Sequence, residues 1–201
     1  MLNIPNSCKV NKILPKKVFY NKKGINSNIK SIFINRIDKI TWLYKLSFET
    51  IGISKTKEVE EIEIFKIDIK EKIIPYSTIK AITKNISYPI LFIIKYEDNY
   101  CYAIKIEDNI YNTNWNEELS IDYNAISLKI LYQNIVKSII KEQDNSKNFN
   151  TLINNKSKQQ ELEKRLNVLE NKLKQEKQFN RKVELNQEIR KIKEEVNKTD
   201  I

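Results

Sequence analysis

The sequence predicts an α+β fold, with a mixed or antiparallel sheet, flanking helices and a long C-terminal helix of the coiled-coil type. Large apolar residues alternate over 40–48, a period of two that is typical of a strand. Apolar residues three and four apart over 27–38 indicate an amphipathic helix. Over 155–200 the chain has neither glycine nor proline, and leucines there repeat the spacing of a coiled-coil seam.

The chain has 201 residues, of which 40% are apolar, enough for one core and an extension. We expect an α+β domain with a basic N-terminal arm at 1–142, a polar linker at 143–157 and a long amphipathic helix at 158–199. Its longest apolar run, Ile90–Ile94, is too short to span a bilayer. Residues 1–5 do not begin the charged-then-apolar pattern that is typical of a leader. A soluble, cytoplasmic protein is therefore expected, with no membrane partner.

The first residues, 1–24, are basic and contain Pro5, Pro15 and Gly24, which favours an extended arm with one short strand at Val18–Tyr20. Ser27–Asp38 is the first expected helix. The strand over 40–48 follows it, with four large apolar side chains on one face: Trp42, Tyr44, Leu46 and Phe48.

Val59–Lys70 is expected to be a central strand, because apolar residues occupy both of its faces. Tyr76–Asn85 is predicted to be a short helix, and the run that begins at Ile90 opens a three-stranded meander. The tripeptide Glu-Asp-Asn occurs twice in the meander and predicts its two turns. A helix at Ala125–Lys141, capped by Asp122, is expected to pack on the sheet.

The apolar stripe of the terminal helix changes register within 175–186. Such a shift indicates a changed partner surface, a local break or a hairpin, and without glycine or proline we expect one continuous helix. An exposed stripe should bind a partner or a second copy of the chain. The predicted contact residues are Leu162, Leu166, Leu169, Leu173, Phe179, Asn180, Arg181, Ile189 and Ile192.

Basic residues gather at the ends of the chain: residues 1–39 contain nine Lys or Arg and a single acid, Asp38. An arm of this kind binds phosphates or an acidic partner, although solubility and codon composition also explain such a bias. Phe19 and Tyr20 either stack on bases or pin the arm to the core. The candidate nucleic-acid-binding residues are Lys12, Lys16, Lys17, Lys22, Lys23 and Arg36.

The chain has no histidine and only two isolated glycines, which argues against the usual catalytic triads, a Walker loop and a dinucleotide fingerprint. Cys8 and Cys101 form no CxxC pair, so neither a disulfide framework nor a zinc site is indicated. No cofactor is expected, and the protein is interpreted as non-enzymatic.

Carboxylate chemistry with magnesium is the alternative. Asp68-Ile69-Lys70 has the acid-x-Lys form that nuclease folds place on a strand, and Glu60 falls on the same face as Asp68 and Lys70. A second metal-binding acid would come from Asp38, Glu49 or Glu58. A solvated strand face explains the same residues, because short acid-x-Lys patterns are common in a chain so rich in charge.

Several segments resemble one family in order along the chain: 13–20 (ILPKKVFY), 40–51, 59–65 (VEEIEIF), 88–92 (YPILF) and 178–186 (QFNRKVELN). They are similar to the bacterial domain-of-unknown-function family DUF4391. This resemblance implies a prokaryotic protein from anti-phage, restriction-type or mobile-element gene neighbourhoods that contain helicases and DNA methyltransferases. No established activity comes with the resemblance, which gives the context and leaves the mechanism open. In that context our leading hypothesis is a non-enzymatic accessory or assembly subunit whose partner is DNA or a helicase or methyltransferase subunit.

Overall fold

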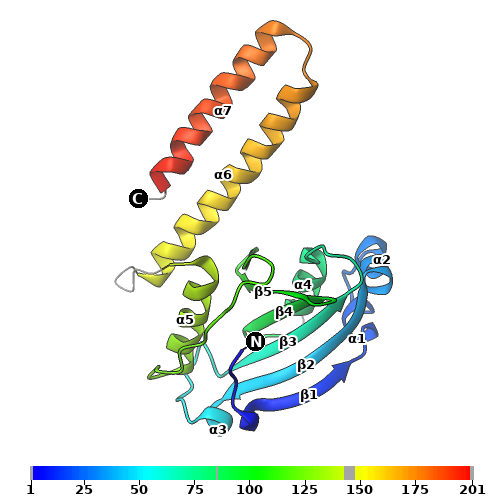
Figure 1. Cartoon of the computed structure of the whole chain (residues 1–201), viewed down its shortest axis with the longest axis vertical. Coiled ribbons are helices and arrows are strands. Elements are labelled where there is room, and N and C mark those ends of the chain that lie inside the picture. The colour runs from blue at the N-terminus through cyan, green and yellow to red at the C-terminus, as the bar shows by residue number, and fades with distance from the viewer. Residues whose placement is uncertain (1, 85, 143–147, 200–201) are drawn as a thin grey trace. The chain divides into compact units, whose positions relative to one another are not determined.

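The computed structural model describes residues 2–84, 86–142 and 148–199 (Figure 1). These residues fall into two compact units, Met1–Gln143 and Asp144–Ile201. Each unit has its own apolar core and is described separately.

The first unit contains a six-stranded sheet whose spatial order is the order of the sequence. Neighbouring strands are antiparallel except β3 and β4, which are parallel and are joined by helix α4. This mixed sheet confirms the α+β class. The strands are β1 (Lys9–Leu14), β2 (Ile37–Ser47), β3 (Glu61–Ile69), β4 (Ile90–Tyr96), β5 (Asn99–Ile106) and β6 (Asn109–Asn112). The helices are η1 (Asn6–Cys8), α1 (Lys17–Tyr20), α2 (Ser27–Asn35), α3 (Phe48–Ile51), α4 (Tyr76–Thr83) and α5 (Leu128–Ile140).

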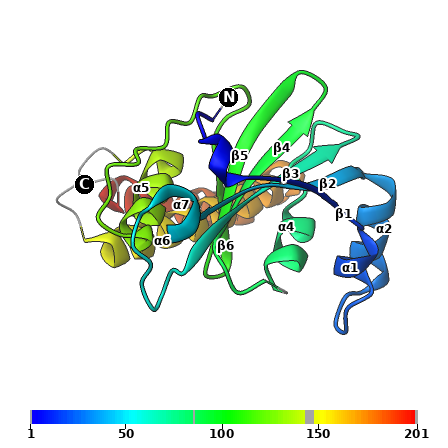
Figure 2. The ribbon, with the colours of Figure 1, turned by 90° about the horizontal axis from the view of Figure 1, so that it is seen from below.

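Strand β3 is central and is covered on both faces, as predicted. Phe65 and Ile67 belong to a core cluster with Phe33 of α2 and Ile79 of α4, and helices α1, α2 and α4 gather on this side of the sheet (Figure 2). On the other face Ile62 and Ile64 are fully buried, and α5 contacts β3, β5 and β6. Apolar burial on both faces therefore fixes β3 as the centre of the unit.

The N-terminal segment differs from the prediction. The strand forms at Lys9–Leu14, where β1 pairs with β2 around a bulge at Asn11, whose φ is 52°. Val18–Tyr20, expected to be a strand, lies in helix α1 instead. Pro15 has no N–H to continue the ladder, and the short helix turns Phe19 into the core, where 3% of it is exposed.

The ends of two predicted helices also move. Helix α2 ends at Asn35 because Ile37 already enters β2, and Asn26 caps its start by accepting from the Ile29 N–H at 2.9 Å. Helix α5 begins at Leu128, after Ser127, whose hydroxyl accepts from the Ile130 N–H at 3.4 Å. Asp122, predicted as this cap, accepts from the Asn124 N–H in a local turn.

The second unit is a hairpin of two antiparallel helices, α6 (Phe149–Gln175) and α7 (Phe179–Thr199), which lie side by side (Figure 1). The prediction of one continuous helix is wrong. Glu176 leaves the helical conformation with ψ 136°, and its carboxylate accepts from the N–H groups of Lys177 and Gln178 at 2.8 and 2.9 Å. The Glu176 side chain thus satisfies the N–H groups that precede α7, so the chain reverses here without a glycine or a proline.

The two apolar stripes bury one another inside this hairpin. Leu162 and Leu169 of α6 pack with Ile189 and Ile192 of α7, with 3% to 8% of each exposed. Lys193 adds an ion pair to Glu170 at 3.1 Å. The change of register in the sequence therefore marks a chain reversal. Within the predicted linker, 143–147 lie outside the described residues, whereas 149–157 form the first turns of α6.

Candidate functional site

The candidate nucleic-acid-binding residues lie on β1, α1 and the adjoining turns of the first unit. Lys12, Lys17, Lys22 and Lys23 are all exposed. Within the described parts of the chain, no carboxylate lies at ion-pair distance from these four ammonium groups. Lys16 donates from Nζ to the carbonyl oxygen of Ile37 at 2.8 Å, which fixes its position and leaves its charge unbalanced. We call the five lysines, together with Arg36, the basic surface.

Elsewhere in this unit, four lysines contact acids. Lys45 pairs with Glu61 at 3.1 Å, and Lys66 pairs with Asp68 at 3.2 Å. The two other pairs are Lys129–Glu58, at 3.0 Å, and Lys141–Glu117, at 2.9 Å. Other lysines of the unit, such as Lys55, Lys70 and Lys95, also lack a described acid at ion-pair distance. Acids outnumber lysines over 40–143, however, so the excess of positive charge lies on the N-terminal elements.

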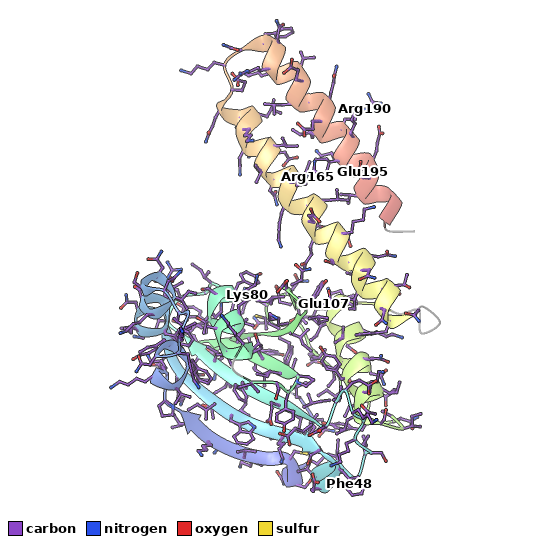
Figure 3. All side chains as sticks on the ribbon, turned by 180° about the vertical axis from the view of Figure 1, so that it is seen from behind. Phe48, Lys80, Glu107, Arg165, Arg190 and Glu195 are labelled. Atoms are coloured by element: carbon purple, nitrogen blue, oxygen red, sulfur yellow. The ribbon has the colours of Figure 1, made fainter. Side chains whose placement is uncertain are left out.

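Helix α4 extends the positive charge beyond the predicted residues. The ammonium of Lys84 lies against Gly24, in the turn between α1 and α2 that also carries Lys22 and Lys23. Lys80, one turn earlier, is exposed and extends from α4 (Figure 3). Sequence reasoning missed these two lysines because only the fold brings α4 beside α1.

Arg36 follows the last turn of α2. Its Nε lies 3.5 Å from Oε2 of Glu71, and about half of each side chain is exposed. A pair this open to solvent contributes at most about 1 kcal/mol, so the guanidinium remains free to exchange Glu71 for a phosphate.

The aromatic residues of this segment belong to the core. Phe19 stacks on Phe33 with ring centroids 6.3 Å apart, and Tyr20 meets the same ring at 5.8 Å. Lys30 places its ammonium 5.6 Å from the Tyr20 ring centre, a cation–π contact. Of the two alternatives for these aromatics, the structure supports the one in which they pin the segment to the core.

The residues of the nuclease alternative are not brought together. Glu60 precedes β3 while Asp68 is near its end, and eight residues of strand span roughly 26 Å. Lys70 lies beyond the strand and is exposed, whereas the partner of Asp68 is Lys66. Among the described residues, no group of three or more acids or cysteines is placed to hold a metal ion.

A buried acid that sequence reasoning missed lies on β3. Glu63 is only 4% exposed, and its Oε2 has no hydrogen-bond partner. Burial, and then the charge of Glu61, raise the pKa of Glu63 to about 8. The burial of Glu63 could have been predicted from the sequence, because alternate residues of a strand share a face and Glu63 is therefore on the face of Phe65 and Ile67.

Both cysteines of the first unit are free and buried. Burial raises the pKa of the Cys101 thiol to about 12, so the thiol stays protonated and unreactive at neutral pH. This placement agrees with the interpretation of Cys101 as a small apolar core residue.

The predicted contact residues of the second unit divide into two groups. Leu162, Leu169, Ile189 and Ile192 are buried between α6 and α7, with Leu166 and Leu173 packed against them. Phe179, Asn180 and Arg181 begin α7 at the closed end of the hairpin and are exposed, Phe179 by 78%. The first group therefore holds the hairpin together, and only the second remains open for a partner.

The chain matches the family described as Domain of unknown function (DUF4391) over residues 2–196, and it belongs to that family. Searches of curated proteins and of solved structures each found no match. Within the described residues, no helix is long and apolar enough to cross a membrane.

Proposed function

We propose that the first unit binds the phosphate backbone of nucleic acid through the basic surface, and that the protein is a non-enzymatic accessory subunit. The observation that carries the proposal is the balance of charge along the unit: residues 1–39 hold nine Lys or Arg and one acid, whereas residues 40–143 hold thirteen Lys and fifteen acids. Lysines without an acidic partner are free to neutralise phosphates, and each neutralised phosphate releases counterions that were condensed on the nucleic acid.

The test is the salt dependence of binding. Changing Lys12, Lys16, Lys17, Lys22 and Lys23 to Gln should flatten the log–log slope by about two to four, since each phosphate contact contributes roughly 0.7 to 0.9. The control changes five exposed lysines of the second unit to Gln: Lys158, Lys164, Lys172, Lys174 and Lys191. Both variants lose the same net charge. Equal slopes for the two, or no wild-type binding at about 50 mM salt, would exclude the basic surface.

The assembly role rests on the closed end of the helical hairpin. Phe179 and Val183 are one helical turn apart on α7 and are 78% and 40% exposed. We propose coiled-coil-type packing between α6 and α7, with this exposed pair as the contact to a second copy or to a protein partner. The resemblance suggests a helicase or methyltransferase subunit of a defence system as that partner.

Sedimentation velocity tests the contact with a second copy. Full-length protein at high concentration should associate, and Phe179→Ser should weaken the association without loss of helix content. Charged side chains such as Arg165 and Arg190 extend from the rest of the hairpin (Figure 3). Arg190→Ser is therefore a control that removes an exposed group outside the apolar pair.

A further inference from the structure

An apolar cavity of about 290 Å³ opens in the first unit where β3 ends. Its walls come from three segments: Ile32 of α2, Ile69 of β3, and the Ile74–Ser77 stretch that enters α4. Strands β3 and β4 are the parallel pair of this sheet, and α4 connects them. The cavity therefore lies at the carboxyl end of a parallel strand, where the chain enters its connecting helix.

Three side chains at the cavity define the chemistry of an occupant. Arg36 offers positive charge and Glu71 offers a hydrogen-bond acceptor, and the weak pair between them is open to solvent. Tyr76 adds an aromatic ring that is 48% exposed, held by a hydrogen bond from its hydroxyl to Oδ1 of Asn112 at 3.0 Å. An occupant that uses all three groups has an apolar or aromatic body beside Tyr76, an N–H group for Glu71 and an adjacent negative charge for Arg36.

The basic surface adjoins the cavity. Arg36 belongs to both, and the carbonyl of the next residue, Ile37, holds the ammonium of Lys16. The backbone N–H of Lys70 donates to the carbonyl oxygen of Arg36 at 2.9 Å, so this residue is also next to Arg36. A phosphate chain bound to Arg36 and Lys16 would lie beside the cavity, because Arg36 lines it.

We propose that this cavity receives one unstacked base of single-stranded nucleic acid while the flanking phosphates lie on Arg36 and Lys16. The inference rests on the proposed backbone binding and adds the class of substrate. A base has apolar faces, an edge with N–H groups and a phosphate on either side. The cavity lies just below the roughly 300–1,000 Å³ of drug-sized ligand sites, which suits one heterocycle. In a duplex each base stays in the stack, so it cannot enter without unpairing.

The test compares two chains of equal length and charge, an oligocytidine and the matching abasic sugar–phosphate chain, each as DNA and as RNA. Wild-type protein should bind the base-containing chain about ten-fold more tightly, as expected for one lodged base. Ser77→Phe fills the cavity from the partly exposed first turn of α4 and should abolish this difference while abasic binding is unchanged. Ser138→Phe, at an exposed position of α5, is the control and should keep the difference.

Tyr76→Ala is a second variant that removes a wall of the cavity from an exposed position, and it should reduce the difference several-fold. The proposal is overturned if wild-type protein binds both chains equally, or if Ser77→Phe and Tyr76→Ala keep the full difference. In either case, binding that weakens with salt and requires the five lysines of the basic surface would still support the proposed binding of the phosphate backbone. Absence of binding to every chain would exclude both proposals.

Discussion

Lys45 lies directly opposite Glu63 in the β2–β3 ladder, but its ammonium contacts Glu61, at 3.1 Å. Glu63 is left among Trp42, Phe65 and Ile90 with one carboxyl oxygen unpartnered. Burial and the neighbouring Glu61 raise the pKa of Glu63 to about 8, so this carboxyl holds a proton at neutral pH in the folded protein.

Replacing Glu63 by Gln should stabilise the protein at alkaline pH. The pKa of Glu63 rises from 4.5 to about 8 on folding, so the folded state binds more protons between these values. The free energy of unfolding therefore falls as the pH rises from about 4.5 to about 8. Glu63→Gln cannot ionise, and at pH 9 it should exceed the wild type in stability by on the order of 2 kcal/mol.

Urea unfolding at pH 5, 7 and 9 measures this effect. The advantage of Glu63→Gln should be small at pH 5 and largest at pH 9. Glu60→Gln, at an exposed position three residues away, controls for the loss of one acid and should follow the wild type. A Glu63→Gln variant that is less stable by the same amount at every pH would contradict the assignment.

Cysteines in place of Glu170 and Lys193 should be joined by a short bismaleimide cross-linker, which spans the space between the two long side chains that they replace. These residues face one another across α6 and α7 as an ion pair at 3.1 Å. In one continuous helix they would be about 35 Å apart, because each residue adds 1.5 Å. Mass spectrometry after proteolysis detects the link. Cysteines in place of Glu163 and Lys193 are the control, since Glu163 is exposed on α6, and they should link poorly within one chain.

Two alanine substitutions on α7 should differ sharply in their cost to stability. Ile192 is 3% exposed in the hairpin core, so Ile192→Ala should lower the free energy of unfolding by about 2–4 kcal/mol. Phe179 is 78% exposed, so Phe179→Ala should change it by less than about 0.5 kcal/mol. Hydrogen exchange of α6 and α7 amides reports the effect within this unit. Similar costs for both substitutions would mean that the stripe packs elsewhere.

Local patterns predicted strands β2 to β6 of the first unit, whereas the N-terminal strand was expected at the wrong residues. The alternation over 40–48 gave most of β2, although Phe48, predicted on the apolar face of this strand, begins α3 and is 54% exposed. Apolar residues on both faces gave the central position of β3. The repeated Glu-Asp-Asn tripeptide gave the turns of the meander, although Glu97 and Glu107 take the left-handed conformation, with φ of 50° and 51°. These features depend on contacts between neighbouring strands, so a short stretch of sequence contains the information.

Features that depend on distant contacts could not be predicted in this way. The reversal between α6 and α7 has neither glycine nor proline and is stabilised by the carboxylate of Glu176 and by burial of one stripe against the other. The candidate site was predicted in part: the lysines followed from local charge, whereas Lys84 and the cavity beside Arg36 depend on where α4 packs. Such placements follow from the tertiary fold.

Asp68 is the residue that separates a structural from a catalytic role for the end of β3. Its Oδ1 contacts Nζ of Lys66 at 3.2 Å, its Oδ2 is buried without a partner, and about a fifth of each side chain is exposed. Asp68→Ala removes one member of a partly buried ion pair and should lower the free energy of unfolding by roughly 1–3 kcal/mol.

Purified wild type with magnesium or manganese should leave single- and double-stranded DNA and RNA intact, and the variant should do the same. Metal-dependent cleavage by the wild type that Asp68→Ala abolishes, with the fold preserved by circular dichroism, would instead establish a nuclease and overturn the proposal of a non-enzymatic protein.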